Sequence, residues 1–214
     1  MSKQVKKQPK TWLGIVIAVA VLVLAVLGAW GEKFFGTMET ENIGENISGK
    51  YYVQIDVENY GQIVAELDAD VAPITVRNFL KLVDQKFYDG LTFHRIISGF
   101  MIQGGDPNGN GTGGSSEKIK GEFSANGVKN DLKHTRGVLS MARSSAYNSA
   151  SSQFFIMHAD AAYLDGQYAA FGQVVSGMEV VDAICQNTPV TDRNGTVTAA
   201  NQPRITSIVR IEKP

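Results

Sequence analysis

Cysteine and net positive charge are the two features that this chain of 214 residues has least of. Because Cys185 is the only cysteine, neither an intrachain disulfide nor a zinc or iron–sulfur site built from thiolates can form. Lysine and arginine number 20 against 21 acidic residues; four of the lysines lie in residues 1–10 and residues 11–30 are uncharged, so residues 31–214 carry a net charge of −5. Phosphate neutralisation needs a basic surface, so this charge argues against a nucleic-acid binder.

The sequence also lacks the motifs of several metal sites and enzymes. Only three histidines are present, His94, His134 and His158, and their wide spacing indicates no metal site. No Gly-x-Ser-x-Gly elbow occurs, which argues against serines such as Ser140 as nucleophiles. Residues 106–117, DPNGNGTGGSSE, match the calcium-loop pattern, but we expect a strand and not a helix before them, and only one position before the glycine is charged. We therefore expect neither a metal nor a cofactor.

One long apolar run stands near the N-terminus. Trp12 to Trp30 are 19 residues without a charge, most of them Val, Leu, Ile and Ala. About 20 such residues span a hydrocarbon core of about 30 Å, so the run predicts a transmembrane signal-anchor helix over residues 11–30. Tryptophans at both ends suit the membrane interfaces, and the basic residues 1–10 are expected to stay in the cytoplasm. The predicted location is therefore the cell membrane, with the rest of the chain on the extracytoplasmic side.

A cleaved secretory signal is the alternative for the same segment. The apolar region of such a signal is shorter, about 7 to 15 residues, and the best exit site here, Ala29-Trp30-Gly31, has a bulky aromatic before the cut. An anchor is therefore favoured, and a secreted protein is expected only if cleavage occurs. Residues 31–49, which are polar, acidic and rich in glycine, are expected to form a flexible tether.

Residues 50–214 are expected to fold as one mainly β domain. Alternating apolar residues predict short strands, beginning with a hairpin around Gly61. The expected strands are residues 51–57, 62–67, 92–97, 100–103, 137–142, 153–157, 170–175 and 204–211. Helical spacing of apolar residues predicts one helix from Pro73 to before Asp89 and another over residues 178–184. Many short strands with two helices favour a β-barrel with helices over its openings.

The segment FHRIISGFMIQGGD at residues 93–106 places one arginine among alternating large apolar residues. An arginine on an apolar wall is costly unless something uses it, so Arg95 is a candidate functional residue. The alternative is a purely structural ion pair with a carboxylate such as Glu122.

Seven segments of the chain occur together in one order and spacing. They are FHRIISGFMIQGGD at 93–106, GTGG at 111–114, GEFSANG at 121–127, LKHTRGVLSMA at 132–142, SQFFI at 152–156, LDGQYAAFG at 164–172 and GMEVVDAI at 177–184. With these segments the sequence resembles the cyclophilin family of peptidyl-prolyl cis-trans isomerases over nearly all of residues 51–211. The segments GEFSANG and LDGQY are similar to those of the bacterial branch. The resemblance implies a closed eight-stranded antiparallel β-barrel capped by two α-helices.

The resemblance also implies a set of site residues. Arg95 matches the catalytic arginine, and the implied catalytic group is completed by Gln103 beside it and by Phe100. The implied substrate-binding residues are His94, Met101, Ala142, Arg143, Phe155, Tyr163, Leu164 and Tyr168. The walls of the family's proline pocket are matched by Phe100, Met101, Phe155 and Leu164. The segment whose backbone pairs with a bound peptide is matched by Ala142 and Arg143.

Three positions depart from the family pattern. Tyr163 stands where many members have tryptophan, Tyr168 where a histidine is frequent, and Ser98 where the arginine strand often turns on proline. Because tyrosine does not reproduce the indole N–H donor in the same place, we expect weaker cyclosporin binding. Tyr168 keeps an aromatic wall but changes its polar edge, which affects substrate preference.

The function implied is isomerisation of X-Pro bonds in exported or cell-surface proteins. The expected mechanism is non-covalent: Arg95 stabilises the twisted amide while an apolar pocket holds the proline. Expected partners are proline-containing peptides, unfolded protein clients and the membrane. The alternative is a non-catalytic proline-peptide binding or chaperone module on the same fold.

Overall fold

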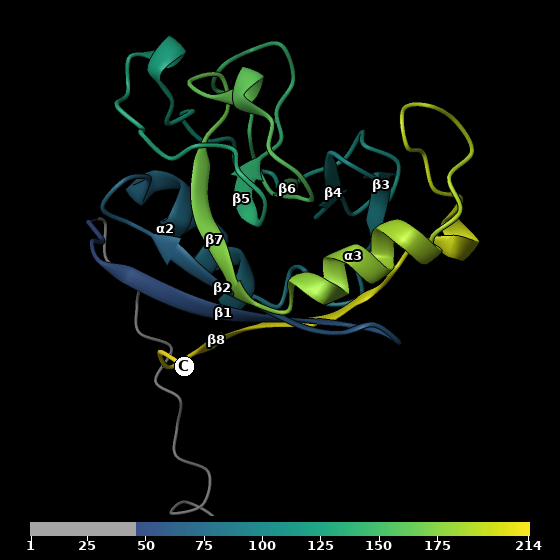
Figure 1. Cartoon of the computed structure of the whole chain (residues 1–214). Helices are drawn as coiled ribbons and strands as arrows, with labels where there is room; N and C mark the ends of the chain where they lie inside the picture. Colours follow the sequence, from purple (N-terminus) through teal and green to yellow (C-terminus); the bar gives the residue numbers. More distant parts are fainter. Residues whose placement is uncertain (1–45) are drawn as a thin grey trace, which may run out of the picture. The chain divides into compact units, whose positions relative to one another are not determined.

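The computed structural model describes residues 46–214 (Figure 1). The helix expected over residues 11–30 and most of the tether expected over residues 31–49 lie outside this range. Within residues 46–214, no helix combines the length and apolar character needed to span a bilayer.

Eight strands form one antiparallel sheet, as the alternation of apolar residues predicts. In chain order they are β1 (Lys50–Val57), β2 (Gly61–Asp68), β3 (Phe93–Ile97), β4 (Met101–Gly104), β5 (Val138–Met141), β6 (Phe154–Met157), β7 (Ala170–Ser176) and β8 (Ile205–Ile211). Their order across the sheet is β3-β4-β6-β5-β7-β2-β1-β8. The sheet curls strongly, so the central strands rise steeply from the plane of β1, β2 and β8 (Figure 1).

The expected closed barrel is corrected to a curled half-barrel, because β3 and β8 remain the two edges of the sheet. These edges do not form a ladder: they meet at their starts, through an isolated bridge between Thr92 and Arg204 and a few backbone hydrogen bonds beside it, such as the one from the Phe93 N–H to the Pro203 carbonyl at 2.9 Å. Loop residues occupy the free edge of β3 instead: the Ile96 N–H donates to the Gly195 carbonyl at 2.8 Å, and Val197 returns a bond to the same strand. This loop stands where a β3–β8 ladder would have to form.

Two α-helices lie at opposite sides of the curled sheet, α2 (Pro73–Asp84) and α3 (Met178–Asn187) (Figure 1). Proline at the first turn starts α2, since the missing N–H has no helical partner there. The helix ends at Asp84, before the Asp89 expected from the sequence, because Lys86 takes a left-handed conformation with φ of 54°.

Glu122 fastens the start of α2 and does not pair with the candidate arginine. Its carboxylate is buried and accepts the backbone N–H groups of Ile74 and Thr75 at 3.0 and 2.8 Å, together with the Thr75 hydroxyl. These bonds satisfy N–H groups that have no partner inside the helix. Glu122 is therefore not the partner of a structural ion pair with Arg95.

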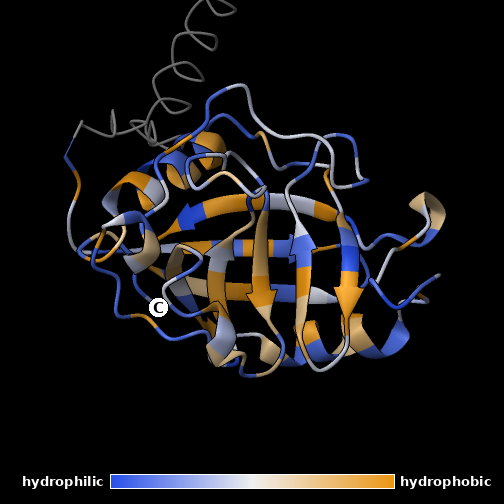
Figure 2. Cartoon of the chain, turned by 90° about the horizontal axis from the view of Figure 1, so that it is seen from above, coloured by the Kyte–Doolittle hydropathy of each residue, from blue (hydrophilic) through white to orange (hydrophobic). Residues whose placement is uncertain are grey.

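The central strands bury side chains on both of their faces. In β6, Phe154 and Ile156 belong to the main core, whereas Phe155 and Met157 belong to a second cluster on the opposite face. Strands buried on both faces consist of nearly continuous apolar residues, as the run FFIM does. Apolar residues are accordingly concentrated on the strands and helices, while the loops around them are largely hydrophilic (Figure 2). The second cluster is the foundation of the candidate site.

Candidate active site

A cavity of about 140 Å³ lies beside the second apolar cluster. Its lining residues are Arg95, Phe100, Met101, Gln103, Ala142, Arg143, Phe155, Leu164 and Tyr168. All nine belong to the eleven site residues that the sequence resemblance implies. The fold therefore brings together β3, β4, β6, the end of β5 and the residues around the 3₁₀ helix η2 (Ala162–Leu164).

The apolar part of the cavity is built from well-packed side chains. Met101 is 1% exposed, Phe155 5% and Leu164 7%. The ring of Phe155 meets the ring of Tyr168 edge to face, with centroids 6.0 Å apart. Phe100 adds a further wall from the turn between β3 and β4. Such a small, mostly apolar hollow suits a compact apolar ring of a ligand.

Arg95 stands at the edge of this hollow and is held by neutral groups. Its Nε donates to the Asn194 carbonyl at 2.8 Å, and its Nη1 donates to Oε1 of Gln103 at 3.2 Å. Arginine has five N–H donors, so three remain without a protein partner among residues 46–214. No carboxylate in that range forms an ion pair with it. The cation is thus positioned by the protein but not neutralised.

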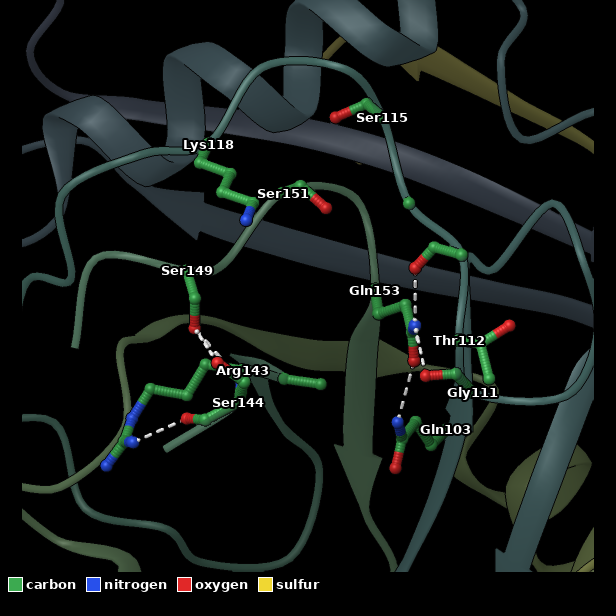
Figure 3. Close-up of a pocket in the computed structure, with 13 residues that line it drawn as sticks. Gln103, Gly111, Thr112, Ser115, Lys118, Arg143, Ser144, Ser149, Ser151 and Gln153 are labelled. Carbon is green, nitrogen blue, oxygen red and sulfur yellow. Dashed lines mark hydrogen bonds between the residues drawn. The ribbon is translucent and has the colours of Figure 1, made fainter. Parts of the chain in front are cut away.

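A chain of amide side chains sets the position of Gln103. Its Nε2 donates to Oε1 of Gln153 at 2.9 Å, and Nε2 of Gln153 donates in turn to the carbonyls of Gly111 and Gly113 at 3.1 and 2.8 Å. Figure 3 shows Gln153 between Gln103 and the glycine loop. Since Nε2 of Gln103 is used as a donor, its oxygen is left to face Arg95. Arg95, Gln103 and Gln153 are thus joined by hydrogen bonds through the two glutamine amides, and we call these three residues the amide relay.

Gln153 is a site residue that the sequence reasoning missed. It lies two positions before Phe155, and residues two apart in an extended segment share a face, which is the one signal that could have indicated it. Its partners Gly111 and Gly113 lie some forty positions earlier, at separations of 42 and 40 residues, so no local pattern shows the contact.

A second, larger cavity of about 420 Å³ adjoins the first and shares Gln103, Ala142 and Arg143 with it (Figure 3). Its other lining residues are Gly111, Thr112, Gly113, Gly114, Ser115, Lys118, Ser144, Ser149, Ser151 and Gln153. The side chains are small or hydroxylated, and the two charged ones, Lys118 and Arg143, are both cationic. This cavity is polar and positive where the first is apolar.

Comparison with known proteins agrees with this geometry. A family model described as "Cyclophilin type peptidyl-prolyl cis-trans isomerase/CLD" matches residues 52–212. The chain belongs to this family of isomerases.

Several relatives share the activity by name. This cyclophilin is 48% identical over 125 residues to the peptidyl-prolyl cis-trans isomerase CYP18-1 of Arabidopsis thaliana, covering 58% of this chain and 76% of that protein. It is 47% identical over 135 residues to peptidyl-prolyl cis-trans isomerase A of Dickeya dadantii, covering 59% and 67%. It is also 42% identical over 157 residues to peptidyl-prolyl cis-trans isomerase-like 2 of Rhizopus delemar, covering 73% of this chain but only 28% of that protein.

Solved structures show the same fold. A cyclophilin type peptidyl-prolyl cis-trans isomerase of Cryptosporidium parvum superposes with a TM-score of 0.68 at 34% identity, covering 78% of this chain and all of that chain. A second structure of that protein, determined in the presence of the dipeptide Ala-Pro, has a TM-score of 0.66 at 35% identity, covering 76% and 99%.

Two residues that the resemblance places in the cyclophilin site do not line either cavity. His94 is 5% exposed, and neither of its ring nitrogens has a hydrogen-bond partner in the described structure. Tyr163 is 70% exposed, with its ring centroid 5.9 Å from that of Phe100, so it forms a rim and not a wall. The weaker cyclosporin binding expected from Tyr163 stays a prediction.

Asp165, His134 and Ser140 are hydrogen-bonded in the order of a hydrolase triad. His134 Nδ1 lies 3.1 Å from Asp165, and its Nε2 lies 3.0 Å from the Ser140 hydroxyl. Ser140 has no exposed surface, however, and lines neither cavity, so its hydroxyl cannot reach a substrate. The imidazole instead stacks against Phe155 with centroids 6.1 Å apart, which supports the wall of the apolar cavity.

Lowering the pH from 7 to 5 is expected to destabilise this cyclophilin. Burial lowers the pKa of both His94 and His134, so the unfolded chain binds protons at these rings more readily than the folded chain. The free energy of unfolding keeps its full value above pH 6.5, the approximate pKa of histidine in the unfolded chain. Below that pH it falls by at most about 1.4 kcal/mol per pH unit for each ring.

Urea unfolding at several pH values measures this loss, with His94→Leu as the comparison. The variant removes one titrating ring that has no hydrogen bond to lose, so its unfolding free energy should vary less with pH. An equal pH slope in the two proteins would show that His94 does not contribute.

Proposed function

We propose that this cyclophilin isomerises X-Pro bonds by a non-covalent mechanism in which Arg95 acts on the amide while the small cavity holds the proline ring. The observation that carries the proposal is the position of Arg95. Its guanidinium borders an apolar cavity, has no carboxylate partner within residues 46–214 and keeps N–H donors available.

The chemistry requires rotation about a partial double bond. Amide resonance makes the barrier about 18 to 20 kcal/mol, so an uncatalysed X-Pro bond isomerises over tens to hundreds of seconds. In the twisted transition state the proline nitrogen has regained its lone pair, and a donor near this nitrogen or the twisting carbonyl lowers the barrier. Arg95 supplies such a donor and remains charged at every relevant pH.

The size of the required effect shows that the cation cannot act alone. Reaching the millisecond range needs about 10⁴-fold acceleration, or about 5 to 6 kcal/mol. One preorganised donor contributes about 2.7 to 4 kcal/mol. The remainder is assigned to the apolar walls, which remove water from the planar amide and so raise its free energy relative to the less polar, twisted form.

Proline-containing peptides and unfolded protein clients are the proposed substrates. The presence of Ala-Pro with the Cryptosporidium parvum relative supports this choice. Ala142 and Arg143 follow β5 directly and line both cavities, so an extended peptide pairing with their backbone would place its proline in one cavity and a neighbouring residue in the other.

Arg95→Ala and Arg95→Lys are each expected to lower kcat/KM for a short X-Pro peptide by about 10² to 10³-fold. Lysine keeps the charge but loses the fork of donors that meets both Gln103 and the amide. Exchange NMR or a protease-coupled assay on the full-length protein measures turnover, and peptide binding measured separately should fall much less.

The same pair of measurements tests the non-catalytic alternative. A binding or chaperone module would hold the peptide without accelerating its isomerisation. Wild-type turnover in Arg95→Ala would contradict the proposed mechanism.

The larger cavity predicts a charge preference. Because its charged side chains are both cationic, a peptide with glutamate near proline should have a kcat/KM about 1.5- to 5-fold above that of a matched lysine peptide. The ratio should shrink in high salt and in Lys118→Ala. Equal rates for both peptides at low salt would show that the cavity does not contact the flanking residue.

We propose that residues 11–30 anchor the isomerase in the cell membrane and that its clients are exported proteins. The uncharged run after four lysines supports this proposal. Extraction of membranes at alkaline pH should leave the protein in the pellet, with a mass that includes the first thirty residues. A soluble protein beginning near Gly31 would instead show that the segment is a cleaved signal.

A further inference from the structure

The turn that carries Phe100 is tied to helix α3 by a histidine that the mechanism does not use. This β3–β4 turn, residues 98–100, meets His158, which follows β6 directly. The Gly99 N–H donates to Nδ1 of His158 at 2.8 Å, and the His158 backbone N–H donates to the Phe100 carbonyl at 2.8 Å. Nε2 of the same ring lies 3.2 Å from the Asp182 carboxylate on α3.

These contacts determine the protonation state in which the ring fits. A backbone N–H can only donate, so Nδ1 of His158 must be unprotonated to accept the bond from Gly99. The proton is then on Nε2, the ring nitrogen that lies 3.2 Å from the Asp182 carboxylate. The neutral imidazole, in this one tautomer, connects the turn to the helix.

The charged groups around the ring come from three segments. Asp182 on α3 and Arg136 before β5 form an ion pair at 2.8 Å, and Arg136 also donates to the His158 carbonyl at 2.8 Å. Asp160, two residues after His158, accepts the Arg136 backbone N–H at 2.8 Å. Cys185 on α3 adds no charge, since burial raises the pKa of its thiol to about 11.

We propose that His158 is a positioning residue for the proline pocket, whose neutral ring holds the β3–β4 turn so that Phe100 lines the cavity and whose protonation releases that turn. The proposal rests on the proposed function, in which Phe100 is a wall for the proline ring. His158 itself lines neither cavity, and the amide relay that holds Arg95 does not include it.

Protonation of the His158 ring at Nδ1 brings two N–H donors face to face. The charged ring carries a proton on Nδ1, which then faces the Gly99 N–H across 2.8 Å, so Nδ1 can no longer accept the bond from Gly99. Release of the turn loosens one wall and weakens binding of the proline ring, while the buried walls Met101, Phe155 and Leu164 still exclude water, so the effect is expected in KM more than in kcat.

The test measures kcat and KM for one X-Pro peptide between pH 5 and 8 in full-length wild type, His158→Asn and His158→Ala. Asparagine places Oδ1 close to where Nδ1 of histidine lies, so it can accept from Gly99 but does not titrate. One neutral hydrogen bond is worth about 0.5 to 1.5 kcal/mol, so its loss corresponds to about a 2- to 12-fold change.

The expected pattern has three parts. The KM of wild type rises by about 2- to 12-fold from pH 8 to pH 5, the KM of His158→Asn stays nearly constant, and that of His158→Ala is raised at every pH. Circular dichroism at each pH checks that the proteins are folded. If His158→Ala does not fold, the comparison of wild type with His158→Asn decides alone.

Two results would overturn the proposal: a wild-type KM that does not change with pH, or the same pH dependence in wild type and His158→Asn. The second result would assign the change to another group, such as His94 or His134. Failure of the proposed function is recognised separately, because Arg95→Ala would then keep wild-type turnover whatever the His158 variants do.

Discussion

Burial on both faces of strands β4 and β6 is the constraint on which the site depends. One face of these strands completes the core of the half-barrel, so the strands cannot shift without exposing Phe154 and Ile156. The other face is thereby held in register and presents Met101 and Phe155 to the cavity. A rigid sheet thus positions a small apolar hollow to a precision that a loop could not provide.

The second requirement is a cation that stays charged and unpaired beside that hollow. The Asn194 carbonyl and the Gln103 amide fulfil this requirement better than a carboxylate would, because neutral groups orient Arg95 without cancelling its charge. Gln103 and Gln153 link the guanidinium to the loop at Gly111 and Gly113 through a continuous set of hydrogen bonds, so that loop fixes the position of the cation. The polar cavity that begins at Gln153 and the apolar cavity at Phe155 therefore share one supporting framework.

Local patterns predicted the strands and helices well, because alternation and helical spacing report directly on which side of an element is buried. They could not predict that the barrel stays open, since the free edge of β3 is covered by residues 194–197, a hundred positions away. Arg95 stood out as an arginine among alternating apolar residues, whereas the other site residues came from the family resemblance. Gln153 and His158 were missed because each acts through contacts with segments distant in the chain.

The most direct test of the central claim is a crystal structure of the protein with an X-Pro peptide bound. The account predicts a proline ring against Met101, Phe155 and Leu164, with the Arg95 guanidinium within hydrogen-bond distance of the imide nitrogen or the preceding carbonyl. A ring bound elsewhere, or a guanidinium turned away from the imide, would contradict it.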